Sequence, residues 1–266
     1  MLISLLLGVL VGAVLGLTGA GGGILAVPAL VVGLGWTMQQ AAPVALIAVA
    51  GGAAIGAVEG FRRKLVRYKA AILMAVAGVP VTSLGILVAR ELPQRALLAL
   101  FAAVMVLVAV RLFLQARKSQ AHEDDTMRLG RVDPITGQFI WSWPTAALLG
   151  AVGALTGFMT GLLGVGGGFV IVPLLRRFTN VSMHGIVATS LLVIALVGLG
   201  GVVTSVLHGT TLPLQLTALF TAATALGMLV GRKASTRLSS RHVQLGFSIV
   251  LVVVAFGLFA KAALNL

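Results

Sequence analysis

Two glycine-rich elements are the parts of this sequence best suited to hold a ligand. The first reads Gly-Ala-Gly-Gly-Gly over Gly19–Gly23, and the second reads Gly-Val-Gly-Gly-Gly over Gly164–Gly168. Each leads into an apolar run with a Val-Pro pair, so Gly19–Leu30 and Gly164–Leu175 are identical at seven positions. Glycine lets a backbone unwind and approach a ligand closely. A helix that starts there exposes free N–H groups and its positive dipole end, which together bind anions.

Close helix packing is the other use of glycine in a membrane. We expect packing for the isolated glycines of the apolar segments, namely Gly8, Gly12, Gly16, Gly52, Gly56 and Gly201. For the doubled element we expect an anion site or a transport pathway. Neither copy precedes Gly-Lys-Ser/Thr or follows a strand pattern, so nucleotide phosphate loops and dinucleotide folds are excluded.

Hydroxyl side chains near both elements can complete such a site. Thr18 directly precedes the first element, Thr156 and Thr160 precede the second, and Thr189 and Ser190 begin a later apolar segment. A bond to a carbonyl one turn back is the alternative role for each hydroxyl. The predicted substrate-binding residues are Thr18, Gly19, Gly21, Gly22, Gly23, Gly164, Gly166, Gly167, Gly168, Thr189 and Ser190.

The elements that must position these residues are membrane helices. The chain of 266 residues is 59% hydrophobic and 9% charged, against about 25% charged residues in a soluble domain. Each half has five apolar segments: 2–17, 24–35, 41–58, 70–89 and 96–114, then 145–161, 168–175, 186–207, 213–231 and 245–260. The second segment of each half is too short to span and is interrupted at Pro28 or Pro173. It is predicted to be half of a broken helix or one limb of a re-entrant hairpin.

Charge places the segments in the membrane. If the chain changes side at each segment, only Arg90, Arg95 and Lys261 of the 19 Lys and Arg residues lie on one side. The positive-inside rule makes the other side cytoplasmic and both termini extracytoplasmic. The basic clusters therefore indicate lipid contact and not nucleic acid. With an odd number of segments per half, the second half inserts inverted, as in secondary transporters. The predicted fold is an all-α integral membrane protein with repeats at 1–116 and 144–266 and a cytoplasmic linker at 117–143.

Few side chains are suited to catalysis or metal binding. Cysteine is absent, and Glu59 and Glu91 are the only acids outside the linker. Glu59 is expected to pair with Arg62 or Arg63 on a helix surface. His184 and His208 are predicted to pack at the membrane interface, with a gate or proton relay as the alternative. We therefore expect no metal, no cofactor and no enzyme activity.

The two glycine elements and Ala188-Thr189-Ser190-Leu191 resemble the sulfite exporter TauE/SafE family of membrane transporters. Segment number, linker position and repeat spacing extend the resemblance over nearly the whole chain. It implies an inner (plasma) membrane permease of bacteria for sulfite, sulfoacetate or a related organosulfur anion. The sequence departs from the family at Pro43-Val44-Ala45-Leu46, where the first repeat often carries a Thr-Ser pair. Thr189 and Ser190 are therefore the better hydroxyl candidates.

The resulting hypothesis is export of a small anion by alternating access around a midplane site. An anion channel and a membrane scaffold without transport are the alternatives. Lipid and the anion are the expected partners. The sequence leaves open the substrate, the direction of transport, the coupling ion and the oligomeric state, with a homo-oligomer as one possibility.

Overall fold

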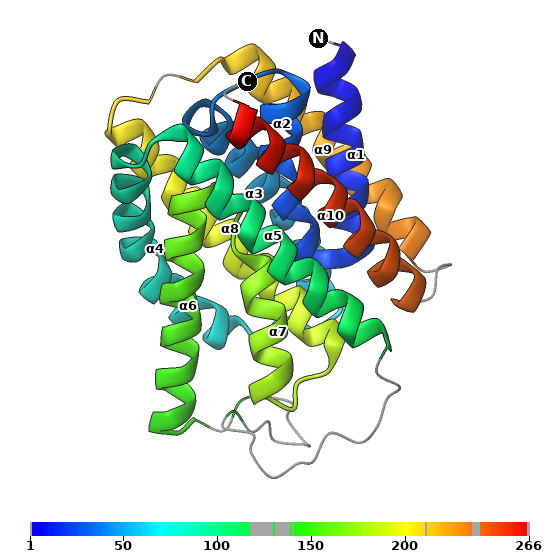
Figure 1. Ribbon diagram of the computed structural model, residues 1–266. Coiled ribbons are helices and arrows are strands. Elements are labelled where there is room, and N and C mark those ends of the chain that lie inside the picture. Colours follow the sequence, from blue (N-terminus) through cyan, green and yellow to red (C-terminus); the bar gives the residue numbers. More distant parts are fainter. Residues whose placement is uncertain are drawn as a thin grey trace.

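The computed structural model describes residues 2–117, 130, 139, 141–210, 212–235 and 240–264, and within these ranges it is an all-helical bundle (Figure 1). The first half comprises α1 (Leu2–Thr18), the 3₁₀ helix η1 (Gly19–Leu25), α2 (Ala26–Gly33), α3 (Met38–Arg62), α4 (Tyr68–Glu91) and α5 (Gln94–Arg117). The second comprises α6 (Trp143–Leu163), α7 (Gly168–Phe178), α8 (Met183–Leu207), α9 (Leu214–Ser235) and α10 (Ser240–Leu264). The predicted all-α membrane fold is confirmed. The acids of the linker, Glu123, Asp124, Asp125 and Asp133, lie outside the described residues.

Seven of the described helices are long and apolar enough to cross a membrane: α3, α4, α5, α6, α8, α9 and α10. By contrast, α2 has 8 residues and α7 has 11, or about 12 and 16 Å of helix against a hydrocarbon layer of about 30 Å. In Figure 1, α2 lies near the end where α1 begins and α7 near the end where α6 begins. The short segments are thus the return limbs of hairpins. Both chain termini lie at one end of the molecule (Figure 1).

Local signals set the helix ends. Thr37 caps α3 with a capping box that uses Gln40, and Ser142 and Ser182 cap α6 and α8. The predicted interruption at the two prolines is wrong, because α2 continues through Pro28 and α7 through Pro173. Pro28 lies in the first turn of its helix, where no intrahelical hydrogen bond is lost.

Helix pairing repeats between the halves. The largest interhelical contacts are α1 with α9 and α4 with α6, followed by α5 with α10 and α3 with α8. Exchanging the two halves converts the first pair into the second and leaves the last two pairs unchanged. This is the pairing that two repeats related by a twofold axis require. Their inverted orientation in a membrane stays a prediction.

Glycine stripes bring the paired backbones together. A Cβ at Gly12 would lie 2.0 Å from the carbonyl oxygen of Thr224, and one at Gly157, 145 positions later, 2.1 Å from that of Gly78. Gly8 and Gly16 meet α9 in the same way, while Gly52, Gly56 and Gly201 meet the ends of packed side chains. The packing role predicted for all six isolated glycines is confirmed. Only glycine permits this approach of two helices.

Candidate functional site

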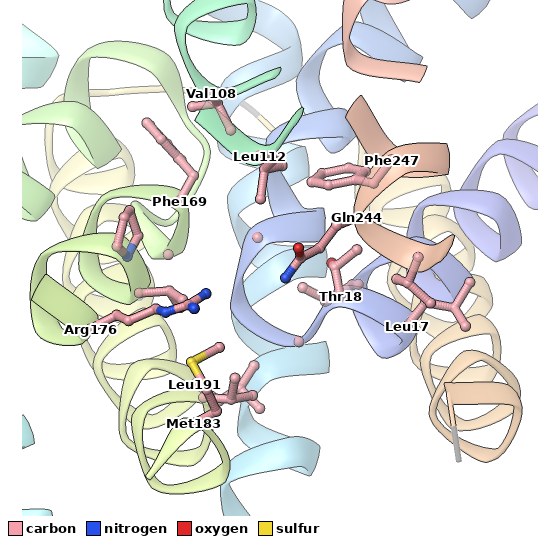
Figure 2. A pocket seen from close by; sticks show the side chains of 18 of the residues that line it. Leu17, Thr18, Val108, Leu112, Phe169, Arg176, Met183, Leu191, Gln244 and Phe247 are labelled. Atoms are coloured by element: carbon pink, nitrogen blue, oxygen red, sulfur yellow. The ribbon is translucent and has the colours of Figure 1, made fainter. Parts of the chain in front are cut away.

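A cavity of about 920 Å³ lies between the two halves and reaches the basic end of the molecule. Both hairpins line it: Thr18, Gly19 and Gly21 from the first, and Gly168, Phe169, Val170, Val172, Pro173, Leu174 and Arg176 from the second. The other walls come from α5, α8, α9 and α10. Figure 2 shows Arg176 of α7 directed across the cavity toward Gln244 of α10, and Thr18 also lines the cavity. The cavity therefore joins chain segments that are more than 150 positions apart.

The first glycine element forms one wall of the cavity with part of its length. Gly19 has φ +73°, and the following residues form η1 without further positive φ values. A Cβ at Gly21 would meet only Phe247 and the Thr18 hydroxyl, at 3.6 and 3.9 Å, so this position borders open space. Gly22 instead packs on α1, where a Cβ would lie 2.4 Å from the backbone of Leu15. The element thus combines cavity-lining and packing glycines.

The second glycine element is an irregular loop. Gly164, Gly166 and Gly167 have φ between +64° and +74°, and Gly164 and Gly167 cap the ends of α6 and α7. The first N–H groups of a helix have no intrahelical partner. Among the hydrogen bonds of the described residues, none is donated by the N–H of Gly168 or Phe169. Both residues line the cavity, so the α7 N-terminus matches the predicted anion-binding geometry.

The two hairpin tips meet at the centre of the molecule. A Cβ at Gly23 would lie 3.2 Å from the carbonyl oxygen of Val165. Val49 of α3 packs against Gly23 and Gly166, and Ile194 of α8 also packs against Gly166. Val49 and Ile194 are buried and stand 145 positions apart in the sequence. The tips of the two elements therefore touch each other, with apolar side chains packed around the contact.

The predicted hydroxyls lie in different surroundings. Thr18 lines the cavity and donates to the carbonyl of Val14, 2.8 Å away. Thr189 is buried outside the cavity lining, and its oxygen accepts from the backbone N–H of Arg67 at 3.0 Å. Ser190 is also buried, and its hydroxyl has no partner among the described residues. Of the predicted hydroxyls, only Thr18 faces the cavity.

The remaining threonines near the second element are both buried. Thr160 donates to the Thr156 carbonyl at 2.8 Å, which is the local bond given above as its alternative role. The Thr156 hydroxyl has no partner among the described residues, and its methyl group contacts the position of a Cβ at Gly167. Neither residue lines the large cavity.

Four arginines line the cavity: Arg63, Arg111, Arg176 and Arg232. Glu59 pairs with Arg63 at 2.6 Å, as expected, and also with Arg232 at 3.1 Å. Arg111 and Arg176 have no ion pair or hydrogen bond within the part of the chain that the structure describes. Both are half-buried. Among the residues that the structure describes, Arg111 and Arg176 are therefore two cavity-lining cations without a counter-ion.

Sequence reasoning missed these arginines because the positive-inside rule already accounts for charges at cytoplasmic helix ends. Arg111 nevertheless lies inside the apolar segment predicted at 96–114. An ionisable residue within a membrane segment is a sign of function, so that signal was present. For Arg176 and Gln244 we find no signal, since the fold alone brings them to one cavity.

His184 lines the cavity at the basic end, whereas His208 lies at the opposite end, bonded through Nδ1 to the Thr204 carbonyl. Both are exposed. In the described ranges no three His, Cys, Asp or Glu side chains gather as a metal site.

Comparison with known proteins also indicates a membrane transporter. The sequence profile of the family "Sulfite exporter TauE/SafE" matches residues 4–258. A "Probable membrane transporter protein" of Xylella fastidiosa (strain 9a5c) is 31% identical over 193 residues, covering 72% of this chain and 69% of the relative. The "Probable membrane transporter protein YunE" of Bacillus subtilis (strain 168) is 25% identical over 260 residues, covering 95% and 94%. No solved structure matches the chain.

Proposed function

The chain belongs to the sulfite exporter TauE/SafE family of membrane transporters, and we propose that it exports a small sulfur oxyanion or sulfonate such as sulfite or sulfoacetate. The observation that carries this proposal is the cavity between the hairpins, lined by the unpaired Arg111 and Arg176. Guanidinium groups suit such anions, because their planar fork donates two parallel hydrogen bonds to a pair of oxygens. Aspartate and glutamate are absent from the described cavity lining, so no fixed anion competes directly within it.

The site we propose lies where Arg176 faces Thr18 and Gln244 (Figure 2). The α7 N-terminus at Gly168 adds free N–H groups and a partial positive charge to the same wall. Phe169, Leu112 and Phe247 supply apolar surface around these polar groups (Figure 2). Such a mixed lining fits an organosulfur anion with a charged head and a short carbon chain. A fully inorganic anion would use the polar wall alone.

The position of the cavity supports export as the direction of transport. It reaches the basic end, which the positive-inside rule makes cytoplasmic, and the apolar contacts of the hairpin tips close it at the centre. An anion would therefore load from the cytoplasm. The membrane potential favours anion efflux by about 2.3 kcal/mol per charge per 100 mV, so an exporter of this kind needs no coupling ion. Alternating access would then carry the anion past the tips.

Two alternatives use the same structure differently. An anion channel would keep the pathway open past the hairpin tips, and a scaffold subunit would not move solutes at all. The closed centre favours a transporter over a channel. The cavity lined by arginines favours a transporter or a channel over a scaffold.

Flux in proteoliposomes tests the proposal. Purified protein would be reconstituted into vesicles loaded with sulfite, sulfoacetate, sulfate, taurine or acetate, and efflux would be followed at imposed potentials. We expect selective, saturable efflux of a sulfur anion that increases as the vesicle interior becomes more negative. Currents that fail to saturate would identify a channel. Fluxes equal to those of protein-free vesicles, with every anion, would contradict transport of this class of substrate.

A further inference from the structure

We propose that a second pocket, at the end of the molecule that carries both termini, is the contracted outer part of the transport pathway and that Arg90 is its anion-binding residue. This inference rests on the proposed function and extends it to the release side. The pocket has a volume of about 90 Å³. Its polar lining includes Arg90, Thr160, Ser205 and Thr210. One cation among hydroxyls suits the same class of small oxyanion as the large cavity does.

The sequence register connects this outer pocket to the large cavity. On α3 and α8, residues that line the outer pocket stand 145 positions before residues that line the large cavity. These pairs are Met38 and Met183, Ala42 and Val187, and Leu46 and Leu191. The spacing equals the offset between the two glycine elements. Equivalent surfaces of the two repeats therefore face the two pockets.

The hairpin residues that line the two pockets are also related by the offset of 145 positions. Gly16 and Gly19 line the large cavity, whereas Gly161 and Gly164 line the outer pocket. A Cβ at Gly19 would lie 2.5 Å from the side chain of Val187, and one at Gly164 would lie 2.4 Å from that of Ala42. Each tip thus packs on the α3 or α8 helix of the opposite repeat in the same manner. The outer pocket is the counterpart of the large cavity, at about a tenth of its volume.

Arg90, an exposed side chain that lines the outer pocket, ties two chain segments together beside it. Its guanidinium donates to the carbonyl oxygen of His208 at 3.1 Å and to the hydroxyl oxygen of Thr210 at 3.3 Å. These bonds connect the last turn of α4 to the segment after α8, and Arg90 and Thr210 both line the pocket. An anion that reached the pocket would compete for the same N–H groups. Opening would then release Arg90 from the protein and make it available to the substrate.

Cysteine accessibility tests the inference, because the natural chain has no cysteine. Ala42→Cys would report on the outer pocket, and Val187→Cys, its counterpart in the other repeat, on the large cavity. Both native side chains are half-buried, which makes them a matched pair. The measurement is the labelling rate of each purified variant with a charged maleimide, alone and combined with Arg90→Ala.

We expect Val187→Cys to react at least tenfold faster than Ala42→Cys. Arg90→Ala should raise the rate at Ala42→Cys several-fold and lower the rate at Val187→Cys, because the two pockets open in turn. Unchanged rates, or a rise at both positions, would overturn the proposal. If Arg90→Ala does not fold, Arg90→Gln tests the same prediction, because its shorter, neutral amide removes the guanidinium group that makes both bonds.

The binding role and the two proposals can be separated. Sulfite or sulfoacetate at saturating concentration should slow labelling of Ala42→Cys in the Arg90→Lys background but not in Arg90→Ala; equal protection in both would overturn the binding role of Arg90. If the wild-type protein exports a sulfur anion but the cysteine-labelling rates do not change with Arg90→Ala, only the inference about the outer pocket is refuted. If Arg90→Ala changes the two labelling rates in opposite directions but no tested anion is exported, the proposed substrate class is refuted. The inference that the two pockets open in turn would still hold.

Discussion

The two glycine elements have the same residues at four of five positions and yet adopt different backbones. Gly19–Gly23 continues α1 into a 3₁₀ helix with one positive φ value, whereas Gly164–Gly168 is an open loop with three. Only the second presents the N-terminus of a regular helix, α7, to the large cavity. The repeated glycines permit two conformations, and the packing of each tip on its neighbours selects one. Structural asymmetry within a symmetric sequence is what alternating access requires.

The largest expected effect contrasts equivalent glycines. Gly166→Ala should reduce the yield of folded protein many-fold, because φ is +74° and the new Cβ would lie 2.8 Å from Ile194. The positive φ alone costs about 1–2 kcal/mol for a residue other than glycine. Gly21→Ala, at the same position of the first repeat, should fold normally, since its Cβ makes ordinary contacts. Size-exclusion profiles of the two purified variants check this. Equal yields would show that the elements do not differ in this way.

The next contrast compares neighbouring arginines of the second hairpin. Arg176→Gln should weaken binding of the transported anion by tenfold or more, since hydrogen bonds to charged groups contribute about 1.5–3 kcal/mol. Arg177 is exposed, with its guanidinium 5.7 Å from the Phe178 ring centroid. Arg177→Gln should therefore change affinity less than twofold. Titration calorimetry with the transported anion measures both. Similar losses in the two variants would mean that general positive charge, and not a site, attracts the anion.

A smaller effect separates the two predicted hydroxyls of α8. Thr189→Val leaves the Arg67 backbone N–H without its acceptor, which costs about 1–3 kcal/mol when the group is buried. Ser190→Ala removes a buried hydroxyl that has no partner among the described residues, so stability should hold or rise slightly. Neither variant should change anion affinity, because neither side chain lines the cavity. A loss of anion binding in Ser190→Ala would show that the Ser190 hydroxyl belongs to the substrate site, as the sequence predicts. Denaturation midpoints and dissociation constants decide the point.

The smallest effect concerns the paired cations. Glu59→Gln frees Arg63 and Arg232 from their carboxylate. Partly exposed ion pairs contribute up to about 1 kcal/mol, so stability should change little. Anion affinity should rise roughly two- to fivefold, by a similar free energy. Weaker binding in Glu59→Gln, measured by the same titration, would show that Glu59 positions the arginines for the substrate.

Much of the fold was predictable from the sequence, because apolar length and glycine spacing report directly on membrane helices. The short segments, the doubled element and the packing glycines followed from these signals alone. The site was less predictable. Arg111 and Arg176 carry the charge of the cavity, but the rule for loop charges explained them equally well. The Thr189 contact with Arg67 joins residues 122 positions apart, and no local pattern encodes such a pairing.

The backbone of each glycine element was also beyond sequence reasoning. The residues of Gly21–Gly23 and Gly166–Gly168 are identical, so their types cannot assign them different φ values. Gly22 packs on the α1 backbone at Leu15, and Gly167 packs on Thr156. These tertiary contacts differ between the repeats, and they fix the local conformation.

The central claim is that a small sulfur anion binds in the cavity between the hairpins at Arg176. The most direct test is the thermal stability of the purified protein in detergent against sulfite, sulfate, thiosulfate, sulfoacetate, taurine and small carboxylates. A ligand of the folded state at a hundredfold excess over Kd adds about 2.7 kcal/mol of stability. We expect a selective rise in Tm with one sulfur anion that persists in Arg177→Gln and is lost in Arg176→Gln. No rise with any anion, or a rise that survives Arg176→Gln, would contradict it.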